Sequence, residues 1–197
     1  MATTIQDGTG TKYTVKIDSD NRIYTKSITE SQFDNATRRG NAYNINTEFI
    51  TITGSTETPL LYLKSNEDTS LVLSAWFIGT DADSGTATRL SLMRVYTNPS
   101  SGTIISSGTD VTPVNRLIGS SNELQAVVKK GGDGFTVSGF TTTPILYQTQ
   151  GNDQRNFGTV QLSLTKGSSV VVTYQHYGLT SNDVYTGFQV YLSDTNL

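Results

Sequence analysis

From Asn41 onward, one short stretch of the sequence after another alternates apolar and polar residues with a period of two. In the stretch 42–52 the alternation runs through Tyr43, Ile45, Thr47 and Phe49, and in 186–194 it runs through Phe188, Val190 and Leu192. A period of two places successive side chains on opposite faces of a β-strand. Gly, Asn and Ser, which favour turns, are abundant, and the chain is poor in helix formers. The sequence therefore predicts an all-β fold, a jelly-roll-like antiparallel β-sandwich of about eight to ten strands.

Three stretches add detail to this prediction. The alternation shifts phase after Phe49, which predicts a β-bulge or a crossing between two sheets. The stretch 70–80 is apolar on both faces, as in a central strand, and it places Trp76 in the core or at an interface. Lys166-Gly167-Ser168 predicts a hairpin that joins strands on either side of it. The stretch 186–194 is expected to be the last strand of the sandwich.

One short helix is predicted before the strands, over residues 29–39. Thr29 with Gln32 fits a capping box, Ile28 with Phe33 fits a hydrophobic staple, and Gly40 fits a C-terminal stop. Asn and Thr within this range are poor helix formers, so a structured loop remains the alternative.

The predicted domains are an N-terminal extension, residues 1–40, and a β-sandwich, residues 41–197. The extension carries an alternating strand over 12–18 and much of the basic charge. An extended strand can add to the edge of another subunit's sheet, so we expect the extension to attach the protein to its neighbours. The residues expected at this interface are Tyr13, Val15, Ile17, Arg22, Arg38, Arg39 and, in the sandwich, Trp76. The alternative is that 12–18 is an edge strand of its own sandwich.

Charge and composition give no reason to expect several classes of partner. The formal net charge is −3 and the pI is about 5.1, which gives no electrostatic reason to expect nucleic acid or an anionic membrane. The longest apolar stretch, 71–78, is too short to span a bilayer, and the first residues lack the apolar core of a secretory signal. There is no cysteine, so disulfides and thiolate chemistry are excluded.

The sequence offers no pattern for catalysis, a metal or a cofactor. Asp81, Asp83 and Gly85 resemble only the start of a calcium loop. His176 is the single histidine, and without a nucleophile elbow or partner acids it reads as a surface or packing residue. We therefore expect a protein that is not an enzyme, with no metal and no cofactor.

Residues 112–134 carry a resemblance. The motif Pro-x-Asn-Arg-x-x-Gly-Ser-Ser, an aliphatic stripe and a Lys-Gly-x-x-Gly turn follow one another there, and the motif is matched by Pro113, Asn115, Arg116, Gly119, Ser120 and Ser121. This stretch resembles a segment of a family of tailed-phage virion structural proteins. Residues 38–73 and 160–174 are similar to two further segments of that family, in the same order, and together the three cover about half of the chain. Leu117 and Ile118 stand where the family often has Asn-Phe.

The resemblance implies a structural protein on the surface of the virion: a capsid decoration (cement) protein, a head fibre or a tail component. The expected location is the outer surface of the capsid. The first expectation is a capsid decoration (cement) protein that binds the major capsid protein, stabilises the head and forms a homotrimer, with no nucleic acid and no membrane as partner. The alternatives are a tail-fibre or baseplate module that recognises host surface glycan, and a major capsid jelly roll. Asn115, Arg116 and Gly119 are expected to hold a structural loop, because an amide can fix a turn and a guanidinium can fork to oxygens.

Overall fold

The computed structural model describes residues 4–6, 12–14, 31–81, 91–98, 103–104, 108–150, 156–177 and 181–193. The chain forms two compact units, Met1–Ser31 and Gln32–Leu197. In the first unit, β1 (Thr4–Gln6) and β2 (Lys12–Thr14) form an antiparallel two-stranded sheet. The second unit holds the sandwich, and its first element, the helix α1 (Gln32–Arg38), belongs to the range that we assigned to the extension.

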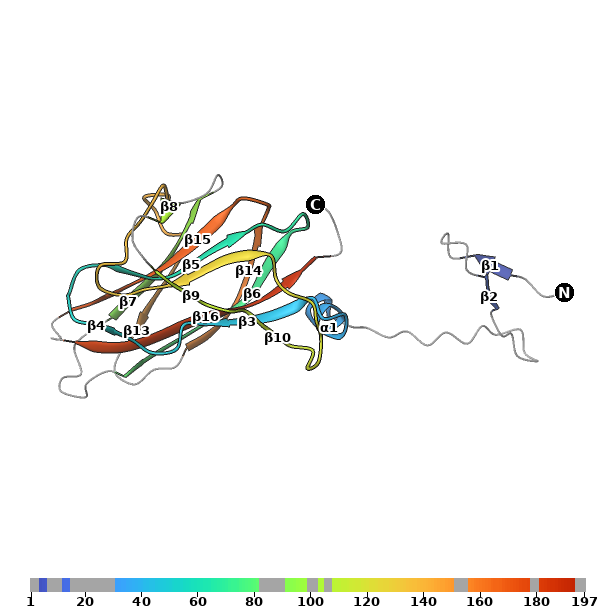
Figure 1. Cartoon of the computed structure of the whole chain (residues 1–197), viewed down its shortest axis with the longest axis horizontal. Coiled ribbons are helices and arrows are strands. Elements are labelled where there is room, and N and C mark those ends of the chain that lie inside the picture. Colours follow the sequence, from blue (N-terminus) through green and yellow to red (C-terminus); the bar gives the residue numbers. More distant parts are fainter. Residues whose placement is uncertain are drawn as a thin grey trace. The chain divides into compact units, whose positions relative to one another are not determined.

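Two six-stranded sheets make up the sandwich (Figure 1). The first contains, in spatial order, β10 (Val114–Asn115), β3 (Ala42–Asn46), β16 (Asn182–Leu192), β6 (Leu71–Asp81) and β14 (Asn156–Leu164), with β4 (Ile50–Ile52) also on β16. The second contains β13 (Leu146–Gln150), β7 (Ser91–Asn98), β15 (Ser169–His176), β5 (Thr58–Ser65), β11 (Ala126–Lys130) and β9 (Thr109–Asp110). A further pair joins β8 (Thr103–Ile104) and β12 (Val137–Ser138).

The order of the long strands is that of a jelly roll. Strands pair in nested fashion from the outside of the sequence inward: β3 with β16, β5 with β15, β6 with β14, and β7 with β13, all antiparallel. Successive members of this series alternate between the two sheets. The predicted jelly-roll-like antiparallel β-sandwich is confirmed.

The inner faces of the two sheets form one core. Period-2 alternation puts residues such as Ile45, Leu73 and Phe188 of the first sheet, and Leu63 and Val172 of the second, in the same fully buried cluster. Long apolar side chains from both sheets exclude water between them, which is the main force that holds the layers together.

The predicted helix is present, and it begins at Gln32. Thr29, the predicted cap, lies outside the described residues. At the other end Gly40 has φ +71°, its N–H donates to the carbonyl of Thr37 (3.1 Å), and the N–H of Asn41 donates to the carbonyl of Ala36 (2.8 Å). This is a Schellman motif, which a glycine at this position favours. The helix packs on the first sheet through a second small cluster, in which the Phe33 ring lies edge-on to Tyr191 at 5.9 Å.

The phase shift after β3 is a bulge within one sheet. β3 and β4 pair with the same strand, β16, and between the two ladders residues 47–49 face only residues 185–186. One extra residue on one strand is the definition of a β-bulge, so the first of the two sequence alternatives is correct.

The predicted hairpin at Lys166-Gly167-Ser168 is wrong. β14 lies in the first sheet and β15 in the second, so the turn carries the chain across the sandwich. Its backbone bonds to β5 instead: the Gly167 N–H donates to the Ser65 carbonyl (2.8 Å) and the Ser65 N–H donates to the Ser168 carbonyl (3.1 Å). A turn signal marks where a chain reverses but not which strand it then meets.

Residues 109–122, here called the strap, cross from one sheet edge to the other. Their first strand, β9, pairs with β11 in the second sheet, and their second, β10, pairs with β3 in the first. The Val111 N–H also donates to the Val128 carbonyl (3.0 Å). The strap thus covers edge strands of both sheets, which would otherwise offer unpaired backbone groups.

Candidate functional site

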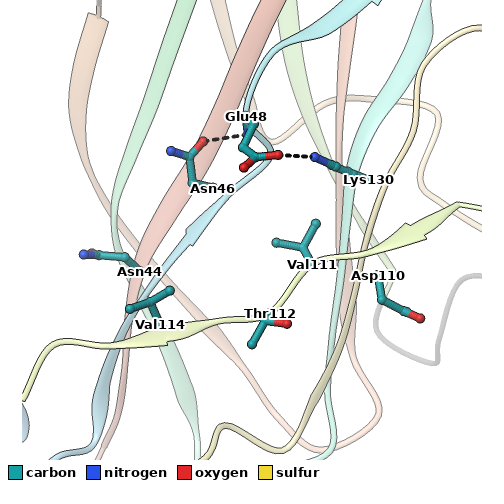
Figure 2. Close-up of a pocket in the computed structure, with 8 residues that line it drawn as sticks. All are labelled: Asn44, Asn46, Glu48, Asp110, Val111, Thr112, Val114 and Lys130. Carbon is teal, nitrogen blue, oxygen red and sulfur yellow. Dashed lines mark hydrogen bonds and ion pairs between the residues drawn. The ribbon is translucent and has the colours of Figure 1, made fainter. Parts of the chain in front are cut away.

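The strap forms one wall of a groove of about 540 Å³ at this edge of the sandwich. Figure 2 shows β3 and the corner after it along one side of the groove, and the strap along the other. The lining residues are Asn44, Asn46, Glu48, Asp110, Val111, Thr112, Val114 and Lys130. Six of these eight residues carry polar side chains, and two valines of the strap add apolar surface.

The corner at the end of β3 fixes the shape of this groove. Glu48 has φ +58°, a left-handed conformation that is unfavourable for a residue with a Cβ. Three bonds hold it there: its N–H donates to Asn46 Oδ1 (3.0 Å), its carbonyl accepts from Thr47 Oγ1 (2.9 Å), and its carboxylate accepts from Lys130 Nζ (2.8 Å). Glu48 lies in the bulge between β3 and β4, where the chain has to change direction to stay paired with β16. The pairing of the sheet therefore imposes the strained backbone conformation of Glu48.

Lysines of β11 tie the groove's walls together. Lys130 also donates to the Thr47 carbonyl (2.7 Å), and Lys129 pairs with Asp110 of β9 at 2.7 Å. The hydrogen bond and the positive charge of Lys130 lower the pKa of the Glu48 carboxyl group. Each of the two carboxylates that line the groove, Glu48 and Asp110, thus forms an ion pair with a lysine of β11.

Asn115 fastens the far end of the strap. Its amide nitrogen donates to the carbonyls of Gly40 (2.7 Å) and Asn122 (3.1 Å), and its amide oxygen accepts from the Leu117 N–H (2.9 Å). One side chain therefore holds the turn after β10 and connects it to the end of α1. A residue with both donor and acceptor atoms is needed for this, which is what an amide provides.

Arg116 makes a second connection. Its backbone N–H donates to the Ala42 carbonyl (2.9 Å), its Nη1 donates to Asn44 Oδ1 (3.0 Å), and its guanidinium lies 4.9 Å from the centre of the Phe33 ring. Gly119, at φ +86°, lies in the exposed turn between these residues and Ser120. Asn115, Arg116 and Gly119 are thus brought together, and the two polar side chains bond within the chain.

Of the residues expected at an interface, only the side chains of Arg38, Arg39 and Trp76 lie within the described part of the chain. The side chains of Tyr13, Val15, Ile17 and Arg22 lie outside the described residues. Arg38 and Arg39 are exposed at the end of α1. Trp76 is 4% exposed and its indole N–H donates to Thr186 Oγ1 (2.9 Å), so it is a core residue and not available for a surface contact in this fold.

His176 is a packing residue, fully buried at the end of β15. Burial lowers its pKa, an effect that the nearby Asp133 carboxylate partly opposes, so the imidazole is neutral near pH 7. A weak backbone contact with Gly54 also opposes the effect of burial on the pKa. The calcium-like residue Asp83 and the side chain of Asp81 lie outside the described residues, and the described part of the chain holds no cluster of three or more potential metal ligands.

Sequence reasoning missed this groove. Its residues come from positions 44–48, 110–114 and 130, which only the pairing of distant strands brings together. The available signal was the polar side of β3, where Asn44, Asn46 and Glu48 alternate with buried residues, and such a pattern is typical of any solvent-facing strand.

Comparison with known proteins identifies no relative: no protein family, no curated protein and no solved structure matches the chain. Among the helices in the described residues, none has the length and apolar character needed to cross a membrane.

Proposed function

We propose that this protein is a structural component of a tailed-phage particle, a decoration (cement) protein that binds the outer capsid surface and stabilises the head. The observation that carries the proposal is where the resemblance to virion proteins falls in the fold. Its three segments contain β3 and β5, the part of the strap after β9 together with β11, and most of β14 and β15. The resemblance therefore falls on strands of both sheets and on the segment that crosses between them. Jelly rolls of this kind are frequent in viral capsids.

Attachment is proposed for the N-terminal extension. A strand containing Tyr13, Val15 and Ile17 would add to a sheet edge of the major capsid protein, and the arginines would approach an acidic capsid surface. The division of the chain supports this role, because residues 1–31 form a compact unit of their own and leave the jelly roll complete without them.

The proposal still includes a homotrimer, but the expected contact surface between its subunits no longer contains Trp76. Trp76 is buried, but the outer face of the first sheet carries an aromatic group formed by Phe49, Phe77 and Tyr185. Phe49 is 63% exposed, and its ring lies edge-on to Tyr185 at 5.1 Å. An exposed phenylalanine beside further rings is typical of the centre of a subunit interface. We expect Phe49→Asp to convert a trimer to a monomer in light scattering, with exposed Ile145→Asp as the matched control. A trimer that survives Phe49→Asp would exclude this surface.

Binding to particles that lack the protein tests the main proposal. The full chain and a chain that begins at Gln32 would each be mixed with such particles, sedimented with them and located by particle imaging. The full chain should appear on the capsid, with binding that weakens as salt rises. The shorter chain should show a cooperative thermal transition and fail to bind. Capsid binding by the shorter chain would refute the role of the extension, and binding of the full chain to tails alone would favour host recognition.

A further inference from the structure

A second groove, of about 400 Å³, lies on the outer face of the second sheet, away from the strap. Its floor is made by β5, β7 and β15, and the segment after β12 forms a wall over it. That segment follows the edge of β7, since the Thr141 N–H donates to the Thr97 carbonyl (3.1 Å). The size falls in the range of small-molecule sites, which begins at roughly 300 Å³.

One part of this groove is apolar. Tyr96 and Phe140 are partly exposed and line it, and Val171, 2% exposed, is also among the lining residues. Phe140 is held in place by an edge-on contact with the buried Tyr62, with ring centres 6.2 Å apart and planes at 88°. The groove therefore offers fixed aromatic surface and not a loose side chain.

The other part is polar and already ordered. Glu57 accepts hydrogen bonds from the Tyr96 hydroxyl (2.8 Å) and from Thr173 Oγ1 (2.5 Å), and it forms an ion pair with Arg94 at 2.9 Å. Burial, together with the bond to Glu57, raises the pKa of Tyr96 to about 12, so the phenol keeps its proton and remains a donor. The hydroxyls of Thr141 and Thr142 stand at the exposed rim.

These features define the chemistry of a ligand. The carboxylate of Glu57 is matched by the guanidinium of Arg94, so the groove has no net charge with which to select an ion. It presents an aromatic surface beside hydrogen-bond donors and acceptors. A sugar ring has the complementary pattern: one face of weakly positive C–H groups, which suits the negative face of an aromatic ring, and a rim of hydroxyls that both donate and accept.

We propose that this groove binds a neutral pyranose ring of a polysaccharide, with Phe140 or Tyr96 against its C–H face and Glu57 and the threonines bonded to its hydroxyls. A peptide strand is a poorer fit, because the β7 edge beside the groove is already paired by β13 and the residues before it. The inference does not depend on attachment to a capsid. On a particle surface it would give the protein a second activity, adhesion to the glycans of a host.

An NMR titration of the full chain with simple sugars tests this site. The probes are the methyl glycosides of glucose, galactose and mannose, and N-acetylglucosamine. We expect at least one to bind with a Kd of about 1 mM, and to shift the backbone amide signals of residues 140–142 and 171–173. Phe140→Ala should weaken binding roughly tenfold through loss of the stacked ring. Thr142→Trp removes no buried contact and should block the groove.

Thr112→Ala, in the strap groove, is the matched control and should bind as the native protein does. The proposal is overturned if no probe shifts the lining residues, or if Thr142→Trp binds sugar normally. It is also overturned if these signals shift with protein concentration in the absence of sugar, since a second copy of the chain would then be the occupant.

Discussion

Replacement of Asn115 tests whether the strap is held by its side-chain bonds. Asn115→Ala removes three donated bonds, to the carbonyls of Gly40 and Asn122 and, at 3.4 Å, to Ser120 Oγ, and one accepted bond, from the Leu117 N–H. Asn115→Asp is the sharper change, because a carboxylate can still accept from Leu117. It cannot donate, and it brings a negative oxygen against the two carbonyls.

The size of the effect follows from the bonds lost. A neutral hydrogen bond contributes about 1 kcal/mol net, and partial exposure of this site lets water replace part of that. We expect Asn115→Ala to lower the free energy of unfolding by about 2 kcal/mol. Asn115→Asp should cost at least as much, about 2–3 kcal/mol, because its repulsion of the carbonyls outweighs the bond it keeps. In a domain of this size, 2 kcal/mol corresponds to a fall in Tm of about 4–8 °C.

Denaturant unfolding, followed by tryptophan fluorescence, measures this difference. The control is Thr112→Ala, an exposed strap residue that lines the groove. It should change stability by less than about 0.5 kcal/mol. If Asn115→Asp is as stable as the native protein, the bond from Leu117 alone fixes the turn, and the link from the strap to α1 contributes nothing.

Three further changes have defined outcomes. Burial lowers the pKa of His176 in the fold, so below the ordinary histidine pKa of about 6.5 protons bind preferentially to the unfolded chain. The free energy of unfolding should therefore fall as the pH drops from about 7.5 through 6.5, by up to about 1.4 kcal/mol per pH unit, and the slope should be smaller in His176→Leu. In Gly187→Ala the added Cβ would collide with the backbone oxygen of Ile45 and the ring of Phe77, and urea unfolding should show a loss of about 3 kcal/mol. Glu48→Gly should melt at a higher temperature than Glu48→Ala, because only glycine adopts φ +58° without strain; equal melting temperatures would mean that the corner is not strained.

Strand positions were predictable because burial on one face imposes a period of two. The last strand illustrates this. Phe188 and Val190 point into the core and are fully buried, whereas Gln189 between them is partly exposed, as the alternation predicts. Which strands pair with one another could not be predicted in the same way. β15 has buried residues on both faces, because the segment around Phe140 covers its outer side. Its pattern therefore does not show whether it pairs with β14, the preceding strand in the sequence, or with strands from elsewhere in the chain.

The roles of single residues depended on long-range contacts that a local pattern does not contain. The sequence left Trp76 as core or interface, and the structure decides this through Thr186, whose hydroxyl accepts the indole N–H inside the sandwich. A buried indole needs such an acceptor, and this one comes from a strand more than a hundred residues away. The two grooves were missed for the same reason, because each is lined by residues from at least three separate parts of the chain.

The end of α1 and the strap hold each other in place through direct contacts. These contacts indicate that the stable sandwich begins at α1. Gly40 is required by its φ of +71°, and a Cβ there would also lie 2.5 Å from Ser120 Oγ in the strap. Its carbonyl accepts from Asn115, while Phe33 lies beneath Arg116. A chain that begins at Asn41 lacks all of these partners, whereas a chain that begins at Gln32 keeps them. The first should be less stable than the second by about 3 kcal/mol, from a half-buried aromatic ring, a cation–π contact and the bonds to Gly40. Equal thermal stability of the two would mean that the helix only rests on the jelly roll, and that the strap closes the sheet edges without it.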